Sequence, residues 1–405
     1  MNPNKPRKVV ILGGAGSMGR ITLRDLIETT PKKERWEFWI ADTSFERAQA
    51  LVHELKDPRV HAVRVDIKDR RTSVKDLSGT DIIINSTSHH LNLDAMELAL
   101  ELKSHYVDLG GLFHMTRRQL ELHERFQRIE RLALLGMGAA PGITNLLAKK
   151  AADTLETVAE IHTRVASYDG TRYVPKPALA VAYSIQTILE EFSNEPAIFT
   201  KGKWTFGKPM SGDQPMRFPS PIGVRRPMHT LHSEVATLPT SFWEKGIREC
   251  TFKIAFDPEF TDRVRFLRDI GMASHDNLTF PGGGLVSPIE VINRVVMNLP
   301  QPQVQGKLKQ HEVVRAIVKG TRKGKRLTLI EDLHTQGMPE WGVGLDIDTG
   351  SPPAIAVQML ALGEIQATGV LPPELCVPVQ PFFKHLKKRK MKLKSEEKAG
   401  WSLKT

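Results

Sequence analysis

Short apolar runs alternate with segments of helical periodicity along the first 150 residues of the chain. Runs of this length predict strands buried on both faces, and a helical period predicts amphipathic helices between them. The expected strands are Val9–Leu12, Trp36–Ala41, His61–Ile67, Asp81–Asn85, His105–Leu109 and Ala133–Met137. The expected helices are Ser17–Thr30, Ser44–Leu55, Leu91–Leu102 and Met115–Arg131. This order, with short links, predicts a right-handed, doubly wound parallel sheet of the Rossmann type.

The pattern changes after a glycine-rich turn at residues 136–142, which precedes a predicted helix over Ile143–Leu155 and indicates a domain boundary. Beyond it, polar and apolar residues alternate, as expected of strands with one solvated face. These strands are Glu160–Ser167, Glu249–Asp257, His311–Gly320 and Arg326–Asp332, and the helices are Ala178–Phe192, Pro288–Leu299 and Ala354–Leu362. Residues 200–228 are expected to form long ordered loops. This part of the chain predicts a second α/β domain with a mixed or antiparallel sheet.

Three glycines at the spacing G-x-G-x-x-G follow the first predicted strand: Gly14, Gly16 and Gly19. In dinucleotide-binding folds such glycines allow a tight turn, the approach of a pyrophosphate and close packing of helix on strand. Ser17 and Met18 begin the helix, where free N–H groups and the helix dipole favour phosphate. An ordinary glycine turn in a βα unit is the alternative. The succession of strand, turn, helix, strand and acid favours dinucleotide binding.

The acid in that succession is Asp42, at the end of the second predicted strand. An acidic residue about 20 residues beyond the last glycine hydrogen-bonds a ribose 2′-hydroxyl. Asp42 therefore favours NAD, because a carboxylate repels a 2′-phosphate, although Arg47 leaves NADP open. Later strand ends reach the same edge of the sheet, so Asp66 is expected near the adenine. The nicotinamide ribose and pyrophosphate are expected to meet Asn85, Ser86 and Thr87.

Composition is ordinary for a globular protein, with 40% hydrophobic and 25% charged residues. The two cysteines, Cys250 and Cys376, exclude a disulfide framework, and the sequence has neither an apolar run that would span a bilayer nor a signal segment. A cytoplasmic protein without membrane or nucleic-acid partners is expected. The net charge of +11 is concentrated at residues 384–405, which hold nine lysines and arginines against two glutamates. A solvated, frayed end is the favoured interpretation, and a surface for an acidic partner is the alternative.

Several segments together resemble the saccharopine dehydrogenase family, including its lysine 6-dehydrogenase and carboxynorspermidine dehydrogenase branches. They are VVILGGAGSMG, NSTSHHLNLDAMELALELKSHYVDLGG, GMGAAPGITNLLA, AYSIQTILEEF, PIGVRRPMHTLHSEVATLP and TGSPPAIAVQMLALGEIQATGVLPPE. The resemblance implies a Rossmann domain over 1–142, a substrate and dimerisation domain over 143–344, a return segment over 345–385 that packs on the Rossmann domain, and a basic tail over 386–405. It also implies a homodimer.

The same resemblance implies NAD(P)-linked oxidation at a C–N bond of a small amino acid. Oxidative deamination of L-lysine or a lysine-derived amine through an imine is the leading expectation. A carboxynorspermidine- or saccharopine-type imine reductase is the second. The third is a non-catalytic NAD-binding module whose basic tail binds an acidic partner.

Such chemistry needs a group that takes the amine proton and a cation that binds the substrate carboxylate. His89 and His90 follow the fourth predicted strand and are candidates for proton transfer, unless they only hydrogen-bond backbone at the start of a helix. Asp108 is expected to act as a base, a ribose contact or a helix cap. Tyr183 either directs its phenol into the cleft or lies in the core.

Carboxylate recognition is assigned to the adjacent pair Arg225 and Arg226. His229 and His232 would face the same way if helical, and His229 is a candidate for substrate binding. No third ligand accompanies these two histidines in the sequence, so no metal is expected.

Overall fold

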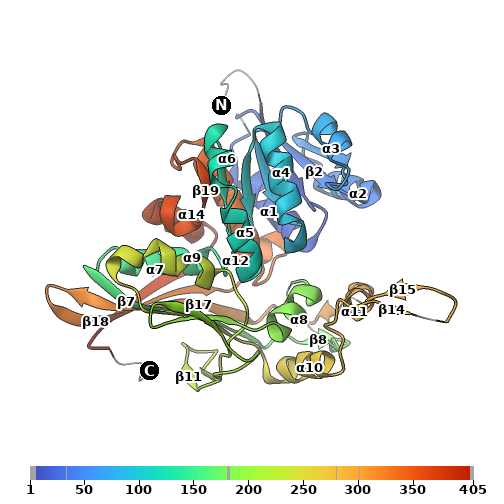
Figure 1. Ribbon diagram of the computed structural model, residues 1–405. Coiled ribbons are helices and arrows are strands. Elements are labelled where there is room, and N and C mark those ends of the chain that lie inside the picture. The colour runs from blue at the N-terminus through green and yellow to red at the C-terminus, as the bar shows by residue number, and fades with distance from the viewer. Residues whose placement is uncertain (1–5, 33, 180–182, 280, 301, 402–405) are drawn as a thin grey trace.

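The computed structural model describes residues 6–32, 34–179, 183–279, 281–300 and 302–401. Within them the chain builds two seven-stranded sheets, one above the other in Figure 1. The first is the predicted parallel Rossmann sheet, and the second is a mixed sheet, so the predicted fold class is confirmed.

The first sheet has the order β3-β2-β1-β4-β5-β6-β19, and every pair in it is parallel. Its strands are β1 (Arg7–Leu12), β2 (Trp36–Asp42), β3 (Val60–Arg64), β4 (Ile82–Asn85), β5 (His105–Asp108), β6 (Leu132–Leu134) and β19 (Gly369–Leu371). The apolar residues of β1 and β4 are fully buried, as the sequence pattern predicts. The order reverses between β1 and β4, which places a ligand crevice at their carboxyl ends.

Helices flank this sheet on both sides (Figure 1). They are α1 (Ser17–Thr29), α2 (Phe45–Leu55), α3 (Arg70–Asp76), the 3₁₀ turn η1 (His89–Leu91), α4 (Asn92–Leu102), α5 (Leu112–Leu120) and α6 (His123–Arg128). The single helix expected over Met115–Arg131 is therefore wrong. It is two short helices, and α3 was not predicted.

The second sheet has the order β10-β9-β13-β7-β17-β18-β20. Its strands are β7 (Thr157–Asp169), β9 (Ala197–Thr200), β10 (Lys203–Phe206), β13 (Glu249–Ala255), β17 (Gln310–Arg322), β18 (Lys325–Thr335) and β20 (Lys392–Ala399). Only β13 and β7 pair in parallel within this sheet. Three small two-stranded antiparallel ladders join β8 (Tyr173–Val174) to β16 (Gln303–Val304), β11 (Met216–Arg217) to β12 (Val224–Arg225), and β14 (Leu278–Thr279) to β15 (Leu285–Val286).

Two helices, α7 (Ile143–Ala152) and α9 (Glu234–Ser241), cover the sheet face that points toward the Rossmann domain (Figure 1). The helices α8 (Ile185–Ser193), α10 (Pro258–Asp269) and α11 (Pro288–Met297) pack together at one end of the sheet. The predicted capping box of Ser287 and Glu290 opens α11. The helix expected over Ala178–Phe192 begins only at Ile185, and residues 180–182 lie outside the described part of the chain.

The C-terminal region first returns to the Rossmann domain. Helix α12 (Ile347–Ala361) packs on α1, and β19 adds to the sheet beside β6. Helices α13 (Pro373–Cys376) and α14 (Val379–Lys388) follow. Helix α12 begins seven residues earlier than the predicted Ala354 and carries Pro352 and Pro353 inside it.

The sequence favoured a solvated, frayed end for the basic residues, and this prediction is wrong for the described part of that end. Residues Lys392–Ala399 form β20, antiparallel to β18. Some of its side chains have partners: Glu397 binds Arg322, and Ser395 donates to Glu331. Residues 402–405 lie outside the described part of the chain. Among the described helices, none has the length and apolar character needed to cross a bilayer.

Candidate functional site

The glycine turn after β1 has the shape that a dinucleotide requires. The residue with positive φ is Gly13 (φ 67°), so the tight turn falls one position before the first glycine of the motif. A Cβ on Gly14 would lie 2.8 Å from the Ile11 carbonyl oxygen, and one on Gly19 would lie 2.6 Å from that of Gly13. Helix α1 then starts after Gly16 without a capping side chain. The N–H groups around Ser17 and Met18 therefore suit a pyrophosphate.

Asp42 and Arg47 flank this turn at Ala15. The Ala15 N–H donates to Asp42 Oδ2 at 3.3 Å, and the Ser44 N–H donates to Asp42 Oδ1 at 3.1 Å. Arg47 Nη2 donates to the Ala15 carbonyl at 3.1 Å. The carboxylate predicted to bind a ribose and the guanidinium of Arg47 thus both contact the backbone of Ala15. Asp66 is exposed at the end of β3 and accepts a hydrogen bond from Lys68 N at 3.0 Å.

Two of the expected crevice residues lie below the surface of the site. Asn85 is buried, and its amide donates to Asn92 and Tyr106 while its oxygen accepts from Thr87. Asp108 is also fully buried and accepts hydrogen bonds from five donors. These are Gly136 N, Gly110 N, Gln119 Nε2, Tyr106 Oη and Asn92 Nδ2. Both side chains shape the crevice from beneath, so a catalytic Asp108 and a cofactor-contacting Asn85 amide do not fit this structure.

Ser86 and Thr87 do reach the glycine turn. The Ser86 carbonyl and Thr87 Cγ2 would each lie 3.1 Å from a Cβ on Gly13. The Ser86 hydroxyl is buried and lacks a hydrogen-bond partner among the described residues. These features fit a dinucleotide at this edge.

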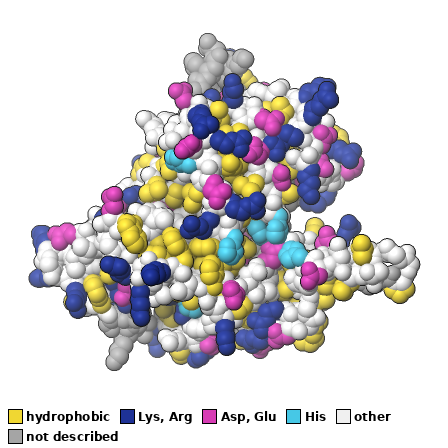
Figure 2. Space-filling model, viewed as in Figure 1, with side chains coloured by type: hydrophobic (Ala, Val, Ile, Leu, Met, Phe, Trp, Pro, Cys, Tyr) yellow, Lys and Arg dark blue, Asp and Glu magenta, His cyan; other side chains and the backbone are white. Residues whose placement is uncertain are grey.

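His89 and His90 lie in η1 and face the acid Glu190 on α8 of the second domain. His90 Nε2 lies 2.8 Å and His89 Nε2 lies 3.4 Å from the Glu190 carboxylate. His275, after α10, places Nε2 at 2.9 Å from the same carboxylate. Figure 2 shows histidine and acidic side chains gathered where the two domains meet. His89, His90 and Glu190 lie close enough together to hold a metal ion.

The electrostatics of this cluster follow from burial and proximity. Burial lowers the pKa of His89 to about 4. The hydrogen bond to Glu190 raises the pKa of His90. Burial opposes ionisation of Glu190, but the neighbouring imidazoles outweigh it and lower the pKa of its carboxyl.

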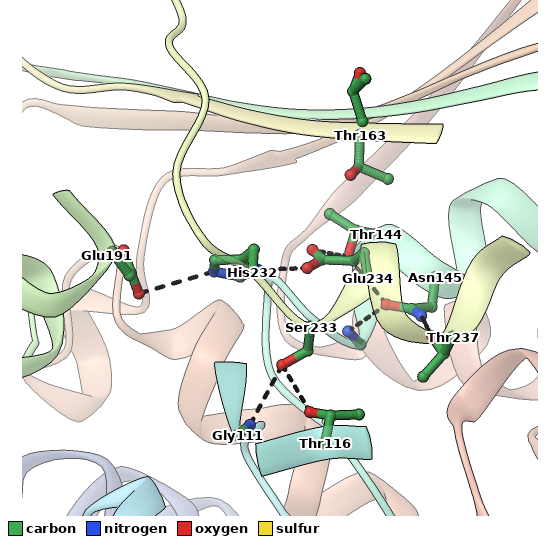
Figure 3. Close-up of polar contacts among 12 residues, drawn as sticks. Gly111, Thr116, Thr144, Asn145, Thr163, Glu191, His232, Ser233, Glu234 and Thr237 are labelled. Atoms are coloured by element: carbon green, nitrogen blue, oxygen red, sulfur yellow. Dashed lines mark hydrogen bonds and ion pairs between the residues drawn. The ribbon is translucent and has the colours of Figure 1, made fainter. Parts of the chain in front are cut away.

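The next residue of α8, Glu191, begins a buried polar chain (Figure 3). Its Oε2 accepts from Tyr183 Oη at 2.7 Å, and its Oε1 lies 3.9 Å from His232 Nε2. His232 Nδ1 bonds Glu234, which in turn accepts from Thr144 Oγ1 at 2.8 Å. Burial raises the pKa of Glu191 to about 7 and raises that of Tyr183 well above its usual value.

A second set of carboxyls lies between β17 and the start of α12. Glu312 and Asp348 face each other, and burial together with their mutual repulsion raises the pKa of Glu312 strongly. Burial raises the pKa of Asp348 to about 6 and that of Asp346 to about 7. Oδ2 of Asp348 is buried without a hydrogen-bond donor in the described part of the chain.

This acidic group adjoins both halves of the site. Glu312 is one of the charges that raise the pKa of Tyr183, which also contacts Glu191. Two residues beyond Asp348, a Cβ on Gly350 would meet Ile21 Cγ2 at 2.4 Å and Met18 O at 3.6 Å. The acids thus lie beside the first turn of α1, near the dinucleotide edge.

The structure does not bring Arg225 and Arg226 to this crevice. They lie on and beside β12, and Phe218 and Ile222 next to them pack with Val313 on the sheet face that points away from the Rossmann domain. Arg226 is bound by Asp213 at 3.0 Å. The expectation that this pair binds the substrate carboxylate is wrong for that reason.

His229 and His232 are not helical and do not face the same way. His229 Nδ1 lies 3.2 Å from the Phe252 carbonyl, and burial together with nearby Lys253 lowers the pKa of His229 to about 3. His232 instead stacks on the Phe252 ring on the side of α9. His229 therefore lies outside the crevice.

Comparison with known proteins identifies the family. A family model described as the saccharopine dehydrogenase NADP binding domain matches residues 9–134, and one described as the saccharopine dehydrogenase C-terminal domain matches residues 138–391. The chain belongs to the saccharopine dehydrogenase family. The predicted family and dinucleotide cofactor are confirmed.

Two curated relatives are carboxynorspermidine synthases. The Vibrio alginolyticus enzyme is 22% identical over 273 residues, which cover 64% of this chain and 63% of the relative. The Vibrio cholerae enzyme is 21% identical over 313 residues, covering 71% and 72%. The match to the first relative thus spans less than two thirds of its length.

Two solved structures share the saccharopine dehydrogenase family fold across nearly the whole chain. Saccharopine dehydrogenase (L-Glu forming) from Saccharomyces cerevisiae has a TM-score of 0.71 and 16% identity, covering 97% of this chain and 100% of that one. Homospermidine synthase from Legionella pneumophila, solved with NAD, has a TM-score of 0.69 and 14% identity, covering 99% and 93%.

Sequence reasoning missed the buried acids of the second domain. Glu190 and Glu191 stand between Leu189 and Phe192 in AYSIQTILEEF, and all four side chains are buried. Two adjacent acids on an otherwise apolar helix face are the signal that would have singled them out, because acids are rarely buried without function or a partner. Glu312, Asp348 and His275 carried no local signal.

Proposed function

We propose that this protein catalyses NAD(P)-dependent interconversion of an amine and an imine at a C–N bond of L-lysine or a lysine-derived amine. The observation that carries this proposal is the set of carboxyls beside the dinucleotide edge. Glu191, Glu312, Asp346 and Asp348 come from three separate elements and share raised pKa values.

Such a set of acids suits a cationic substrate. Like charges brought together in a buried site are held partly protonated, at a cost in free energy. An ammonium group bound among them relieves the repulsion and supplies the missing donors. The unpartnered Oδ2 of Asp348 is one acceptor for it. Lysine and polyamine-like amines carry the positive charge that this surface requires.

The chain's own residues then divide the work. The turn Gly13–Gly19 and Asp42 would hold the dinucleotide, which when bound accepts or supplies the hydride. The acidic set orients the amine. The phenol of Tyr183 donates its own proton in a hydrogen bond to Glu191 Oε2. His89 and His90 close the crevice from the Rossmann side.

The direction of the reaction forms a second question. Oxidative deamination was the leading expectation from the sequence, while the curated relatives are named as carboxynorspermidine synthases. These names favour the alternative in which an imine is reduced to a secondary amine. The non-catalytic module loses its main support, because its basic tail is built into the second sheet as β20.

The test is turnover by the purified full chain with NAD and NADP in both directions, followed as NAD(P)H absorbance. The panel contains lysine, saccharopine and carboxynorspermidine. Asp348→Asn is expected to raise the KM of the amine at least tenfold, whereas Asp262→Asn, an exposed aspartate paired with Arg265, is the matched control. Turnover of neutral substrates alone, or an Asp348→Asn variant with unchanged KM, would contradict the proposal.

A further inference from the structure

Three imidazoles converge on one carboxylate where the two domains meet. Nε2 of His89, His90 and His275 all face the two oxygens of Glu190. They come from three segments: η1 of the Rossmann domain, helix α8, and the residues that follow α10. Glu190 itself is only 4% exposed.

The distances match those between ligands of a single metal ion. Ligands about 2.0–2.2 Å from one ion lie about 2.8–3.5 Å apart in tetrahedral or octahedral geometry. Here His90 Nε2 lies 2.8 Å from Glu190 Oε1 and His89 Nε2 lies 3.4 Å from Oε2, and ligand atoms of the three residues all lie within 4.8 Å of one another. Nitrogen and carboxylate ligands in this number are those that zinc and similar ions prefer.

Hydrogen bonding alone accounts poorly for the arrangement. Oε1 of Glu190 has three nitrogens around it, from His90, His275 and Gln186. Oε2 of the same carboxylate is buried and accepts no hydrogen bond within the described part of the chain. Buried polar atoms normally have a hydrogen-bond partner, so the unpartnered Oε2 calls for an explanation. An oxygen left open among imidazoles is instead free for a cation.

We propose that Glu190, His89 and His90 bind one divalent transition-metal ion, with zinc as the representative. This departs from the sequence expectation of no metal, which did not consider His89 and His90 as ligands. The ion would join the Rossmann domain to the second domain across the crevice. Three protein ligands leave a coordination position for water or a donor atom of a substrate. The proposal stands independently of the substrate suggested above.

The test uses the untagged full chain after chelator treatment and dialysis. Zinc is titrated by calorimetry, and cobalt(II) is added as a spectroscopic probe of the same site. We expect one ion per chain, visible cobalt absorption bands from the nitrogen and oxygen ligands, and a higher unfolding temperature with zinc. Glu190→Gln is expected to weaken binding by at least about a hundredfold, since loss of even an outer-shell partner costs 10–100-fold.

Two further variants guard against misfolding and unspecific binding. His90→Ala removes a half-exposed ligand, so this variant is expected to fold and yet bind zinc at least tenfold more weakly. His311→Ala breaks the separate pair in which His311 Nε2 lies 3.0 Å from His334 Nδ1, and zinc affinity should stay unchanged. Binding of less than one ion per chain at micromolar zinc, or equal affinity in the parent, Glu190→Gln and His90→Ala proteins, would overturn the proposal.

Discussion

Asp25 and Asp348 are two buried aspartates at helix α12, and they meet opposite surroundings. Asp25 on α1 is fully buried and accepts from Arg389 Nε at 2.7 Å, Arg389 Nη2 at 2.5 Å and Ser351 Oγ at 2.5 Å. Asp348 lies in the first turn of α12 and is 2% exposed. It faces the acid Glu312, and its Oδ2 lacks a donor in the described part of the chain.

The difference distinguishes a structural aspartate, Asp25, from a candidate functional one, Asp348. A buried carboxylate whose acceptors are all filled by the protein fastens elements together, here the C-terminal return to the Rossmann domain. A buried carboxylate that faces another acid and has one oxygen without a donor destabilises the fold unless a ligand cancels the charge. The second kind therefore indicates where a cation binds.

The largest expected effect comes from removing Arg389, the charged partner of Asp25. Arg389→Ala leaves Asp25 charged and buried, and we expect a loss of about 3–5 kcal/mol in the free energy of unfolding. Urea denaturation of the parent and variant measures it. Asp25→Leu combined with Arg389→Met removes both charges and should recover most of the loss. A single variant within about 1 kcal/mol of the parent would show that the pair does not hold the return segment.

Arg389 also shows what sequence reasoning cannot see. In the sequence it is one of many cations in the basic end and is expected to be solvated. In the structure it is 1% exposed, because α14 carries it to a partner 364 residues away in sequence. Local patterns predicted β1, the glycine turn and the capping box of α11, since each depends on neighbours in sequence. Pairings across hundreds of residues leave no such pattern.

The second prediction concerns how the acids Asp346 and Asp348 make the stability of the protein depend on pH. The folded-state pKa values of Asp348 (about 6) and Asp346 (about 7) lie above their usual value of 3.8. Such groups contribute stability that is fully present below pH 4 and is lost as the pH rises through 6 to 7. Between pH 5 and pH 8 we expect a loss on the order of 2 kcal/mol from this set.

Asp348→Asn isolates that contribution from other titrating groups. It removes one charge of the set and lowers the repulsion felt by Glu312 and Asp346, so its stability should fall less between pH 5 and pH 8 than that of the parent. Urea midpoints across this range give the comparison, with Asp262→Asn as the control. Parallel pH profiles for the parent and Asp348→Asn would mean that the acids are not held together as the structure has them.

The candidate site was predictable only on its Rossmann side, because only that side is built from residues close together in sequence. Gly14, Gly19 and Asp42 form a local motif, and the structure places them around one turn. Glu312 and Asp348 lie on different elements, and nothing in either neighbourhood marks them. Asp108 lies at a strand end as expected. It is buried, however, and accepts hydrogen bonds from the N–H groups of Gly110 and Gly136 rather than facing the crevice.

A smaller effect is expected from the acid beside the glycine turn. Asp42→Ala removes the carboxylate predicted to bind a ribose 2′-hydroxyl, and kcat/KM with NAD should fall about tenfold, or about 1.4 kcal/mol. The value with NADP should change less, because Arg47 remains beside Ala15. Steady-state kinetics with both cofactors measure the ratio. An equal fall with NAD and NADP would contradict the assignment of Asp42 to the 2′ position.

The smallest effect is expected from an arginine–aspartate pair that resembles Asp25–Arg389 only in composition. Arg226 and Asp213 lie 3.0 Å apart, but their side chains are 58% and 56% exposed. Water screens such a pair, so Arg226→Ala should change the free energy of unfolding by less than about 0.5 kcal/mol. Because β12 lies on the sheet face away from the crevice, the KM of the amine should also stay the same. An increase of KM would restore the sequence prediction that Arg226 binds the substrate carboxylate, and would mean that the far face of the second sheet takes part in binding.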